Sequence, residues 1–483
     1  MEHPRRTAIW RFLFLTFLFV LTSSGRVRVI DEVLPVYQTE SLVERGSTAV
    51  PQAVSQDFFF GKRDLAGNPQ APYPPGPAVV AVPWYLVGKH VLVNLPGVPR
   101  RASTLVTDFA IVTSSAAFAA AAAALTYLLF IRLGLARRNA LLAALGLVFG
   151  TPLFAYSAWY FSEPLAVAVL MVAVVALFPR EEDAVPLRGA VGAGLALGFL
   201  LWVRPAHILT VPIVMAAMLA GRGGLRRKVP GIAVVAALVG CAGLALLARN
   251  YALYGNALEQ GYPELVEGGR RMVSFDTPLP VGLFAFLLSP GKSILLFAPV
   301  LLLAPFALPH VWRRSRALAV LMVAPLLVLL VFYAKYTQFD GGYSFGPRYL
   351  IPGIWLLGLT LGFALEYGSR TLRTVAGALV LAGALVNAIG LATSPLEDMA
   401  GGRYYDQQFN YRLDYNPLQG QLGLLLKYAT DAKPAPIGRG FDRWFVFLHK
   451  GGVTTGWLAL VGGLAAAACL GAAWQLRRTI AEP

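Results

Sequence analysis

Residues 226–251 read RRKVPGIAVVAALVGCAGLALLARNY, an apolar run that follows directly on a cluster of cations. The run is long enough for one membrane-spanning helix, which needs about 20 residues. Lys and Arg are enriched in the cytoplasmic connections of membrane proteins, close to the ends of the spans. The stretch therefore predicts a helix that begins at the cytoplasmic face and leads outward.

The same pattern recurs along the whole chain, with about 12 expected spans and a cationic cluster after every second one. The clusters are Arg5/Arg6, Arg137/Arg138, Arg180/Arg188, Arg222/Arg226/Arg227/Lys228, Arg313/Arg314/Arg316, Arg370/Arg373 and Arg477/Arg478. The expected spans lie at about 8–24, 104–134, 140–158, 164–178, 188–203, 206–220, 229–251, 291–309, 317–335, 349–366, 374–392 and 453–474. Since all clusters fit one register, both termini are expected to be cytoplasmic.

The composition agrees with a multi-pass membrane protein. Of the 483 residues, 57% are hydrophobic and 14% are charged, whereas soluble proteins carry about 25% charged residues. The spans are expected to be helices, because strands of membrane barrels alternate polar and apolar residues. The predicted fold class is therefore all-α, with residues 1–483 forming a single membrane domain. The net charge of +16 does not indicate nucleic-acid binding, since the cations lie in short connections between spans.

The predicted topology places three long loops outside the cell, at 25–103, 252–290 and 393–452. The first of them is expected to carry short helices that lie along the membrane surface as a lid. Asp31 and Glu32 suit the start of one helix, and Gly46 suits its end. Pro74–Pro77 then introduces an apolar helix at 78–91, whose aromatic rings would lie at headgroup level.

Cysteine and histidine placement gives no sign of a metal centre. Cys241 and Cys469 both lie inside apolar spans, which argues against a disulfide framework and a thiolate-bound metal. The histidines show no ligand spacing, so no metal is expected. The stretch from Ala8 to Ser24 has the length of a signal peptide. It lacks a clear small-residue cleavage pattern and acids follow at once, so an uncleaved first span is predicted.

Three carboxylates lie at the outer ends of expected spans. Asp31 and Glu32 follow the first span closely, where a carboxylate could serve as a general base just above the bilayer. Capping of a helix is the alternative for both. Glu163 lies among aromatic residues before Pro164; the cost of a charge near hydrocarbon favours a functional or paired role. A place in the first turn of a helix is the alternative for Glu163.

Three cations lie on the expected outer side, where the orientation rule does not call for them: Arg204, Lys292 and Arg348. If they converge on one cavity, they would suit a phosphate group. Snorkelling to the lipid headgroups is the alternative. The Ser-Pro-Gly-Lys-Ser segment at 289–293 is not a phosphate-binding P-loop, because the required glycine spacing is missing.

Aromatic residues mixed with acids and amides crowd two of the outer loops. Such a mixture offers flat faces on which a sugar ring can stack and polar groups that bind its hydroxyls, and an interfacial aromatic belt is the alternative. The residues are Tyr251, Tyr254, Asn256, Glu259, Tyr262 and Glu264 in one loop, and Tyr404, Tyr405, Asp406, Tyr411, Asp414 and Tyr415 in the other.

In these features the chain resembles the GT-C superfamily of membrane glycosyltransferases, which take a sugar from a polyprenyl-phosphate carrier. Members include protein O-mannosyltransferases and the aminoarabinose transferases that modify lipid A. The resemblance covers the whole chain in layout and is most specific in the first half. The segments that carry it are Asp31-Glu32, Tyr37, Pro74-Pro75-Gly76, Ser162-Glu163-Pro164, Ser289-Pro290-Gly291-Lys292 and Gly346-Pro347-Arg348-Tyr349.

The resemblance implies an inverting transfer on the extracytoplasmic side of a bacterial cytoplasmic membrane. The acid at the Asp31 position, with Glu32 beside it, would deprotonate the hydroxyl of a lipid, glycan or protein acceptor. The substrate-binding residues would be Tyr37, Glu163, Arg204, Lys292, Arg348 and Tyr349, among which the basic residues stabilise the departing phosphate. No cofactor is implied; some relatives bind a divalent metal, which nothing in this sequence requires.

Two other functions fit a multi-pass protein. A transporter or flippase for a lipid-linked glycan should carry ionisable residues near mid-span, broken helices and internal repeats. A non-catalytic scaffold of an envelope complex would need no acids at the start of a lid-like loop. Because the charges lie mainly at span ends and in outer loops, chemistry at the membrane surface is favoured over both.

Overall fold

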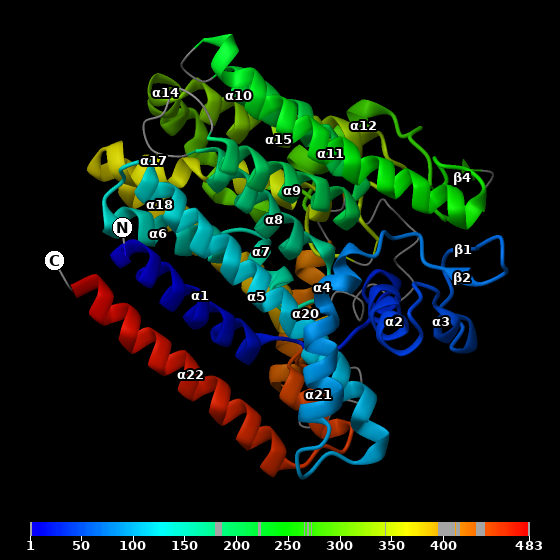
Figure 1. Cartoon of the computed structure of the whole chain (residues 1–483). Coiled ribbons are helices and arrows are strands. Elements are labelled where there is room, and N and C mark those ends of the chain that lie inside the picture. Colours follow the sequence, from blue (N-terminus) through cyan, green and yellow to red (C-terminus); the bar gives the residue numbers. More distant parts are fainter. Residues whose placement is uncertain are drawn as a thin grey trace.

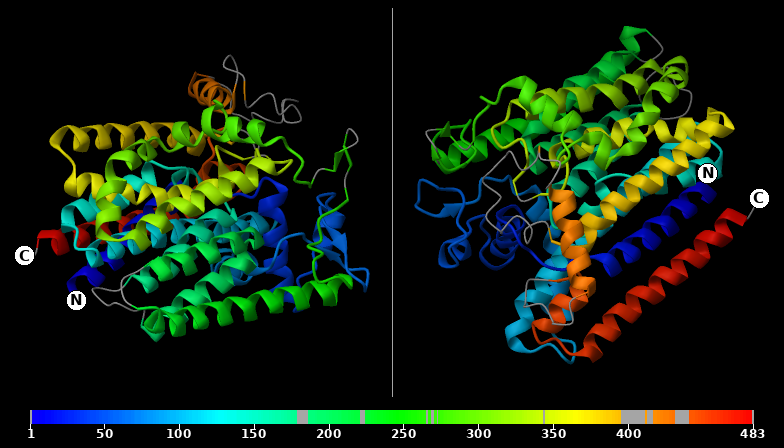
Figure 2. Two further views of the ribbon diagram at one scale, coloured as in Figure 1. Left: turned by 90° about the horizontal axis from the view of Figure 1, so that it is seen from above. Right: turned by 180° about the vertical axis from the view of Figure 1, so that it is seen from behind.

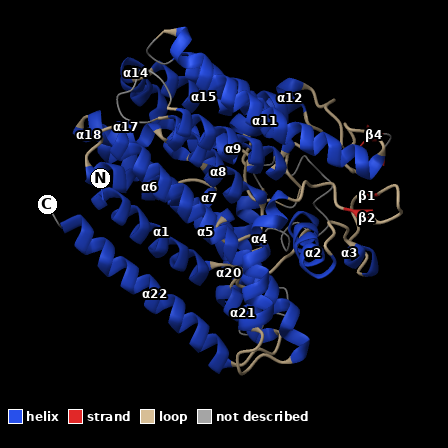
Figure 3. Cartoon of the chain, in the orientation of Figure 1, coloured by secondary structure: helices blue, strands red, loops and turns tan. Residues whose placement is uncertain are grey.

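The computed structural model describes residues 2–178, 186–220, 224–264, 266–267, 270–271, 273–342, 344–394, 411, 416–430 and 440–481. Most of these residues are helical, and loops make up nearly all of the rest (Figure 3). Strands occur among them only as two short antiparallel pairs: β1 (Lys62–Arg63) with β2 (Pro69–Gln70), and β3 (Val266–Glu267) with β4 (Arg270–Arg271). The all-α prediction therefore agrees with the structure.

Among the described residues, six helices are long and apolar enough to cross a membrane. They lie at Arg100–Arg132, which includes α5 (Ser103–Arg132); α11 (Leu225–Tyr254); α15 (Arg316–Lys335); Arg348–Tyr367, which includes α16 (Ile351–Gly358) and α17 (Thr360–Tyr367); α18 (Arg370–Ala392); and Thr455–Arg478, within α22 (Thr455–Ala481). Shorter apolar helices are α8 (Ser162–Leu177), α9 (Leu187–Val203), η3 (Pro205–Thr210) with α10 (Val211–Ala220), and α12 (Leu279–Leu288). The chain is a multi-pass helical membrane protein, but a count of 12 spans is not confirmed.

Two of the expected spans are interrupted in the structure. The span expected at 140–158 is divided into α6 (Arg137–Phe149) and α7 (Leu153–Tyr156), and the break contains Pro152. Proline has no N–H to donate and its ring clashes with the preceding turn, so it ends or kinks a helix.

The span expected at 291–309 is likewise replaced by three short helices, of which the second begins at Pro299 and the third carries Pro305 in its first turn. They are α13 (Ile294–Phe297), η4 (Pro299–Leu303) and α14 (Ala304–Arg314). In addition, α12 is an apolar helix inside the segment 252–290 that was expected to be a loop. The proline rule was available from the sequence, but apolar content alone set the expected boundaries.

The helices form one bundle, with the chain termini at one end and the short elements of the first long loop at the other (Figure 1). α1 (Glu2–Thr22) corresponds to the first expected span and packs against α5 and α22. The largest hydrophobic cluster includes residues of α1, α5, α8 and α9. The views in Figure 2 show the same separation between the two ends of the bundle.

The first long loop contains the predicted short helices: α2 (Ile30–Arg45), α3 (Pro51–Ser55) and α4 (Gly76–Val87), which a π-helical turn (Gly88–Leu92) extends. Gly46 ends α2 with a φ of 63°, a left-handed conformation that glycine adopts without strain. Gly76 begins α4 where a Cβ atom would lie 2.4 Å from the carbonyl oxygen of Trp202. Glycine at this position therefore lets the loop approach the end of α9 closely.

The last long segment contains α20 (Pro417–Thr430) and α21 (Trp444–Lys450). Within it, Tyr411 stacks on Phe284, with ring centroids 5.9 Å apart. The other aromatic and acidic residues singled out there lie outside the described residues: Tyr404, Tyr405, Asp406, Asp414 and Tyr415.

Candidate active site

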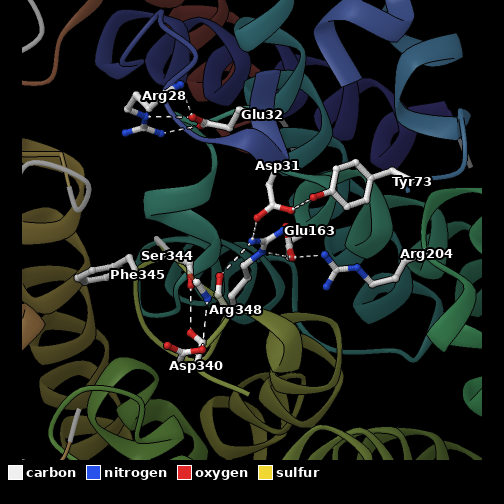
Figure 4. A network of polar contacts seen from close by, with 12 residues as sticks. Arg28, Asp31, Glu32, Tyr73, Glu163, Arg204, Asp340, Ser344, Phe345 and Arg348 are labelled. Carbon is white, nitrogen blue, oxygen red and sulfur yellow. Dashed lines mark hydrogen bonds and ion pairs between the residues drawn. The ribbon is translucent and has the colours of Figure 1, made fainter. Parts of the chain in front are cut away.

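Four segments that are far apart in the sequence meet at one polar cluster at the loop end of the bundle (Figure 4). Asp31 comes from the first turn of α2, Glu163 from the first turn of α8 and Arg204 from the residue after α9. Arg348 begins η5 (Arg348–Leu350), which leads into α16. We call Asp31, Glu163, Arg204 and Arg348, together with Tyr73, the site cluster.

Arg348 is the centre of the site cluster. Its Nη1 donates to Asp31 Oδ2 at 2.8 Å, and its Nε donates to Glu163 Oε1 at 2.8 Å. The guanidinium carbon lies 4.3 Å from the ring centroid of Phe161. The side chain is only 3% exposed. Arg348 is therefore held by two carboxylates and an aromatic face, and it has little freedom to move as a whole.

Glu163 joins the two arginines of the cluster. Its Oε1 accepts from Arg348 and also lies 3.1 Å from Arg204 Nη2, whereas its buried Oε2 has no hydrogen-bond partner among the described residues. Both interpretations of Glu163 thus describe its position, since it lies in the first turn of α8 and is also paired. The Arg204 side chain is 20% exposed, so it is the arginine of the cluster that an incoming anion reaches first.

Asp31 is the most exposed carboxylate of the cluster, with 29% of its side chain accessible. Its Oδ1 accepts a hydrogen bond of 2.6 Å from the Tyr73 hydroxyl. Burial raises the pKa of Asp31, but the Arg348 guanidinium and the two hydrogen bonds outweigh burial and bring it below its ordinary value. Asp31 is therefore an ionised carboxylate with one face open to a ligand.

Tyr73 was not among the residues that the sequence pointed to. Burial and the neighbouring Asp31 carboxylate both raise the pKa of Tyr73, so it remains a hydroxyl that can donate. The available signal was its position directly before the Pro74-Pro75-Gly76 turn. The close approach of Gly76 to α9 brings that turn, and Tyr73 with it, into the site.

Tyrosine rings surround the accessible part of the cluster. Tyr349 stacks on Tyr333 with centroids 4.4 Å apart and an interplanar angle of 14°. The guanidinium carbon of Arg204 lies 4.9 Å from the Tyr349 ring. Tyr262 meets Tyr73 edge to face, with ring centroids 6.3 Å apart. The sequence singled out Tyr262 and Tyr349, and the structure brings both to the cluster; Tyr333 was missed.

Lys292 does not contact the site cluster directly. Its Nζ donates to the carbonyl oxygen of Ser344 at 3.1 Å, and the side chain is buried. Arg348 contacts a neighbouring part of the same region, since it donates to Gly341 O at 3.2 Å. Burial lowers the pKa of Lys292 to about 8, and Asp340 partly opposes this effect. Lys292 thus binds the backbone at Ser344, close to Gly341, which Arg348 contacts.

Glu32 and Tyr37 also lie apart from the site cluster. Glu32 is fully buried and receives two side-chain hydrogen bonds from Arg28, at 2.7 and 3.2 Å. Arg28 in turn donates to Asp442 at 2.7 Å. Asp442 also accepts from Arg26 at 2.7 Å. We call Arg26, Arg28, Glu32 and Asp442 the anchor cluster. Tyr37 donates to Gln56 at 2.5 Å, which ties α2 to the segment after α3.

An apolar cavity of about 230 Å³ lies next to the site cluster. Pro72 and Pro74, which flank Tyr73, contribute to its wall, as does Pro205, which follows Arg204. The remaining wall comes mainly from α11 and the segment after it, and includes Leu246, Leu247, Arg249, Asn250, Leu258 and Gln260. An apolar chain attached to a headgroup at the cluster would fit this cavity in chemical character.

Within the described part of the chain, no group of three or more His, Cys, Asp or Glu side chains is placed to hold a metal ion. Asp31 and Glu163 are instead neutralised by Arg204 and Arg348. The site cluster therefore offers paired charges, an unpartnered carboxylate oxygen and aromatic faces.

Comparison with known proteins finds similarity at the level of structure and not of sequence. No protein-family model matches the sequence, and no curated protein matches it. The chain is similar to the crystal structure of ArnT from Cupriavidus metallidurans in the apo state, with 13% identity and a TM-score of 0.49. The match covers 96% of this chain and 73% of that one. At this identity and TM-score the likeness establishes neither a shared activity nor a shared site.

Proposed function

We propose that this protein is an inverting glycosyltransferase of the GT-C type, which moves a sugar from a polyprenyl-phosphate carrier to a hydroxyl acceptor. The observation that supports this most is a partly exposed carboxylate, Asp31, that is paired with Arg348 and belongs to one ion-pair network with Glu163 and Arg204, beside an apolar cavity. A base, an anion site and a place for an apolar chain are the requirements of such a reaction. The proposal places the site on the extracytoplasmic side of a bacterial cytoplasmic membrane, with both termini in the cytoplasm.

In the proposed reaction, Asp31 Oδ2 takes the proton of the acceptor hydroxyl as its oxygen attacks the anomeric carbon of the sugar. The bond between that carbon and the phosphate oxygen breaks, and its electron pair stays on the phosphate. Arg204 and Arg348 stabilise the charge that develops there. Since the acceptor attacks from the face opposite the phosphate, the configuration at the anomeric carbon is inverted.

The other residues of the site have supporting roles in this proposal. The unpartnered Oε2 of Glu163 accepts a hydrogen bond from a sugar hydroxyl. Tyr262 and Tyr349 provide ring faces for the C–H faces of the sugar. Lys292 adds positive charge next to the backbone carbonyl of Ser344. Tyr37 and Glu32 act on α2 rather than on the substrate.

The neighbouring cavity gives the carrier a place to bind. Its walls are mainly apolar and include Pro72 and Pro205, the sequence neighbours of Tyr73 and Arg204. A phosphate bound at Arg204 would therefore leave the attached prenyl chain at the mouth of an apolar cavity. An apolar cavity with walls so close in sequence to the site cluster favours a lipid-linked donor over a soluble nucleotide sugar.

One observation favours transport of a lipid-linked glycan as a second candidate function. Arg11 lies in the middle of α1, is fully buried and has no hydrogen-bond partner for any guanidinium nitrogen. Its guanidinium carbon lies 3.8 Å from the Tyr127 ring centroid. Ionisable residues at mid-span are a feature of transporters. A flipping assay in proteoliposomes that lost all activity in Arg11→Leu, without sugar transfer in the native protein, would establish this alternative.

The proposal is tested by transfer from a polyprenyl-phosphate sugar in proteoliposomes. The full chain should move a radiolabelled sugar from the carrier to a component of a cell-envelope extract. Asp31→Asn should remain folded and lower the transfer rate by about 10²–10⁴-fold, the usual contribution of a general base. Glu40→Gln, which removes a carboxylate from the same helix, is the matched control. Undiminished transfer by Asp31→Asn would exclude Asp31 as the base.

A further inference from the structure

We propose that the ion pair between Asp31 and Arg348 is a resting contact, and that the phosphate of the donor displaces Asp31 from Arg348 when it binds. Donor binding would then itself release the base. This inference rests on the proposed function and adds an order of events to it. The structure offers geometric and electrostatic reasons for such an exchange.

The two partners of the ion pair differ in how firmly they are held. Arg348 is 3% exposed and keeps its Nε bond to Glu163 and its contact with Phe161, whatever happens at Nη1. Asp31 is 29% exposed, so it is the more accessible partner of the ion pair. The Asp31 carboxylate therefore occupies the position from which an external anion would approach Arg348.

Tyr73 allows Asp31 to leave Arg348 without being lost from the site. The hydroxyl of Tyr73 binds Oδ1 at 2.6 Å, whereas Arg348 binds the other oxygen, Oδ2. A small rotation of the carboxylate about the Tyr73 contact would free Oδ2 for the acceptor hydroxyl. The same rotation would free the Nη1 hydrogen of Arg348 for a phosphate oxygen.

The formal charges favour the exchange once an anion arrives. In the free protein, Asp31 and Glu163 balance Arg204 and Arg348. A phosphate adds negative charge next to Arg204 and Arg348, and this charge competes with Asp31 for the same guanidinium. The competition is relieved when Asp31 turns away from Arg348 and accepts a hydrogen bond from the acceptor hydroxyl instead.

The same groups determine how strong a base Asp31 is. Burial raises the pKa of Asp31, whereas Arg348, Tyr73 and Arg204 lower it. A bound phosphate would raise this pKa further, because a like charge disfavours the ionised carboxylate. Glu163 from α8 and the hydroxyls of Tyr262, Tyr336 and Tyr349 complete its surroundings. Loss of the Arg348 contact removes the largest lowering influence, so a displaced Asp31 holds a proton more firmly.

Binding of polyprenyl monophosphate, which carries no sugar, tests the exchange without any turnover. Asp31→Asn removes the competing charge, so the full chain in nanodiscs should bind the monophosphate about tenfold more tightly or better. Asp31→Ser should show the same tightening, which covers the case in which one variant folds poorly. Glu40→Gln, which removes one negative charge from the same helix, should bind like the native protein.

Two further outcomes separate this inference from the proposed function. If the native protein binds polyprenyl monophosphate no better than it binds polyprenol, the proposal of a phosphate-linked donor is wrong. The proposed exchange at Arg348 is then wrong as well. If the native protein binds the monophosphate and both Asp31 variants bind it equally or more weakly, only the exchange is wrong. A simple anion site to which Asp31 contributes no competition would give this second result.

Discussion

The site cluster and the anchor cluster both begin on the first turn of α2, from adjacent carboxylates. Asp31 turns towards Arg348 and is 29% exposed, whereas Glu32 turns towards Arg28 and is fully buried. In the anchor cluster, Asp442 is also fully buried and accepts from two arginines. In the site cluster, Glu163 Oε2 has no partner in the described part of the chain. Charge alone therefore does not indicate a binding site. An ion-pair network indicates one when part of it is exposed to solvent and one of its polar atoms lacks a hydrogen-bond partner.

The anchor cluster has a different role, which follows from what it connects. Arg26 and Arg28 lie between α1 and α2, and Asp442 lies shortly before α21. The backbone N–H of Trp444 also donates to Ser23 O at 3.0 Å. The cluster therefore fixes the segment before α22 to the start of α2. Buried charges of this kind are costly to desolvate, and removing one partner leaves the others uncompensated.

The largest expected effect is on stability and concerns the anchor cluster. Arg28→Gln leaves the Glu32 carboxylate and Asp442 Oδ2 without their cation. The free energy of unfolding should therefore fall by about 3–5 kcal/mol. Denaturation in mixed micelles measures this change. Arg45→Gln, at the exposed C-terminal end of α2, is the control and should change the free energy of unfolding by no more than about 0.5 kcal/mol. Similar values for both variants would show that the anchor cluster does not stabilise the fold.

The corresponding change in the site cluster should act mainly on turnover. Arg348→Gln removes a cation that faces the developing phosphate charge, and the transfer rate should fall by about 10²–10³-fold. The measurement is initial-rate transfer in proteoliposomes, normalised to folded protein. Arg28→Gln should keep its transfer rate per folded molecule at a temperature where it remains folded. If Arg28→Gln lost as much transfer as Arg348→Gln, the distinction between the two clusters would be wrong.

A smaller effect is expected for the exposed cation of the site. Arg204→Gln should weaken the binding of polyprenyl monophosphate by about 10–100-fold, the worth of a charge-assisted hydrogen bond. Arg204→Lys should recover part of this loss, because it keeps the charge without the planar geometry. Arg63→Gln, an exposed cation in β1, serves as control and should have no effect. Unchanged binding by Arg204→Gln would remove Arg204 from the anion site.

The smallest expected effect is a shift of the pH profile. The Tyr73 hydroxyl lowers the pKa of Asp31 by donating to its ionised form, so Tyr73→Phe should raise that pKa. Because Asp31 acts as a base only when ionised, the acidic limb of kcat/KM should move to higher pH. Tyr85→Phe, which loses a hydrogen bond to Glu44 in the same loop, should leave the limb in place. If the acidic limb did not move in Tyr73→Phe, the limb would report the titration of a group other than Asp31.

Local rules predicted much of the fold from the sequence. Apolar length located the long helices such as α5, α11 and α15, and the acids and Gly46 located both ends of α2. The length of an apolar run does not predict the broken helices, because the breaks depend on Pro152 and Pro299 inside those runs. It did not predict whether the 12 expected spans cross the membrane as separate helices.

The candidate site was only partly predictable. Span ends and loop placement pointed to Asp31, Glu163, Arg204 and Arg348, and the structure brings these four together. Spacing alone could not separate Asp31 from Glu32, since adjacent residues of a helix point in different directions and their partners come from distant segments. Tyr73 depends on the contact between Gly76 and α9, a tertiary feature without a local signal.

A structure of the full chain with bound polyprenyl monophosphate tests the central claim most directly. The account predicts phosphate density beside Arg204 and Arg348, the prenyl chain in the cavity bounded by Pro72 and Pro205, and Asp31 bound to Tyr73 but no longer to Arg348. Phosphate density remote from both arginines, at either end of the bundle, would contradict it.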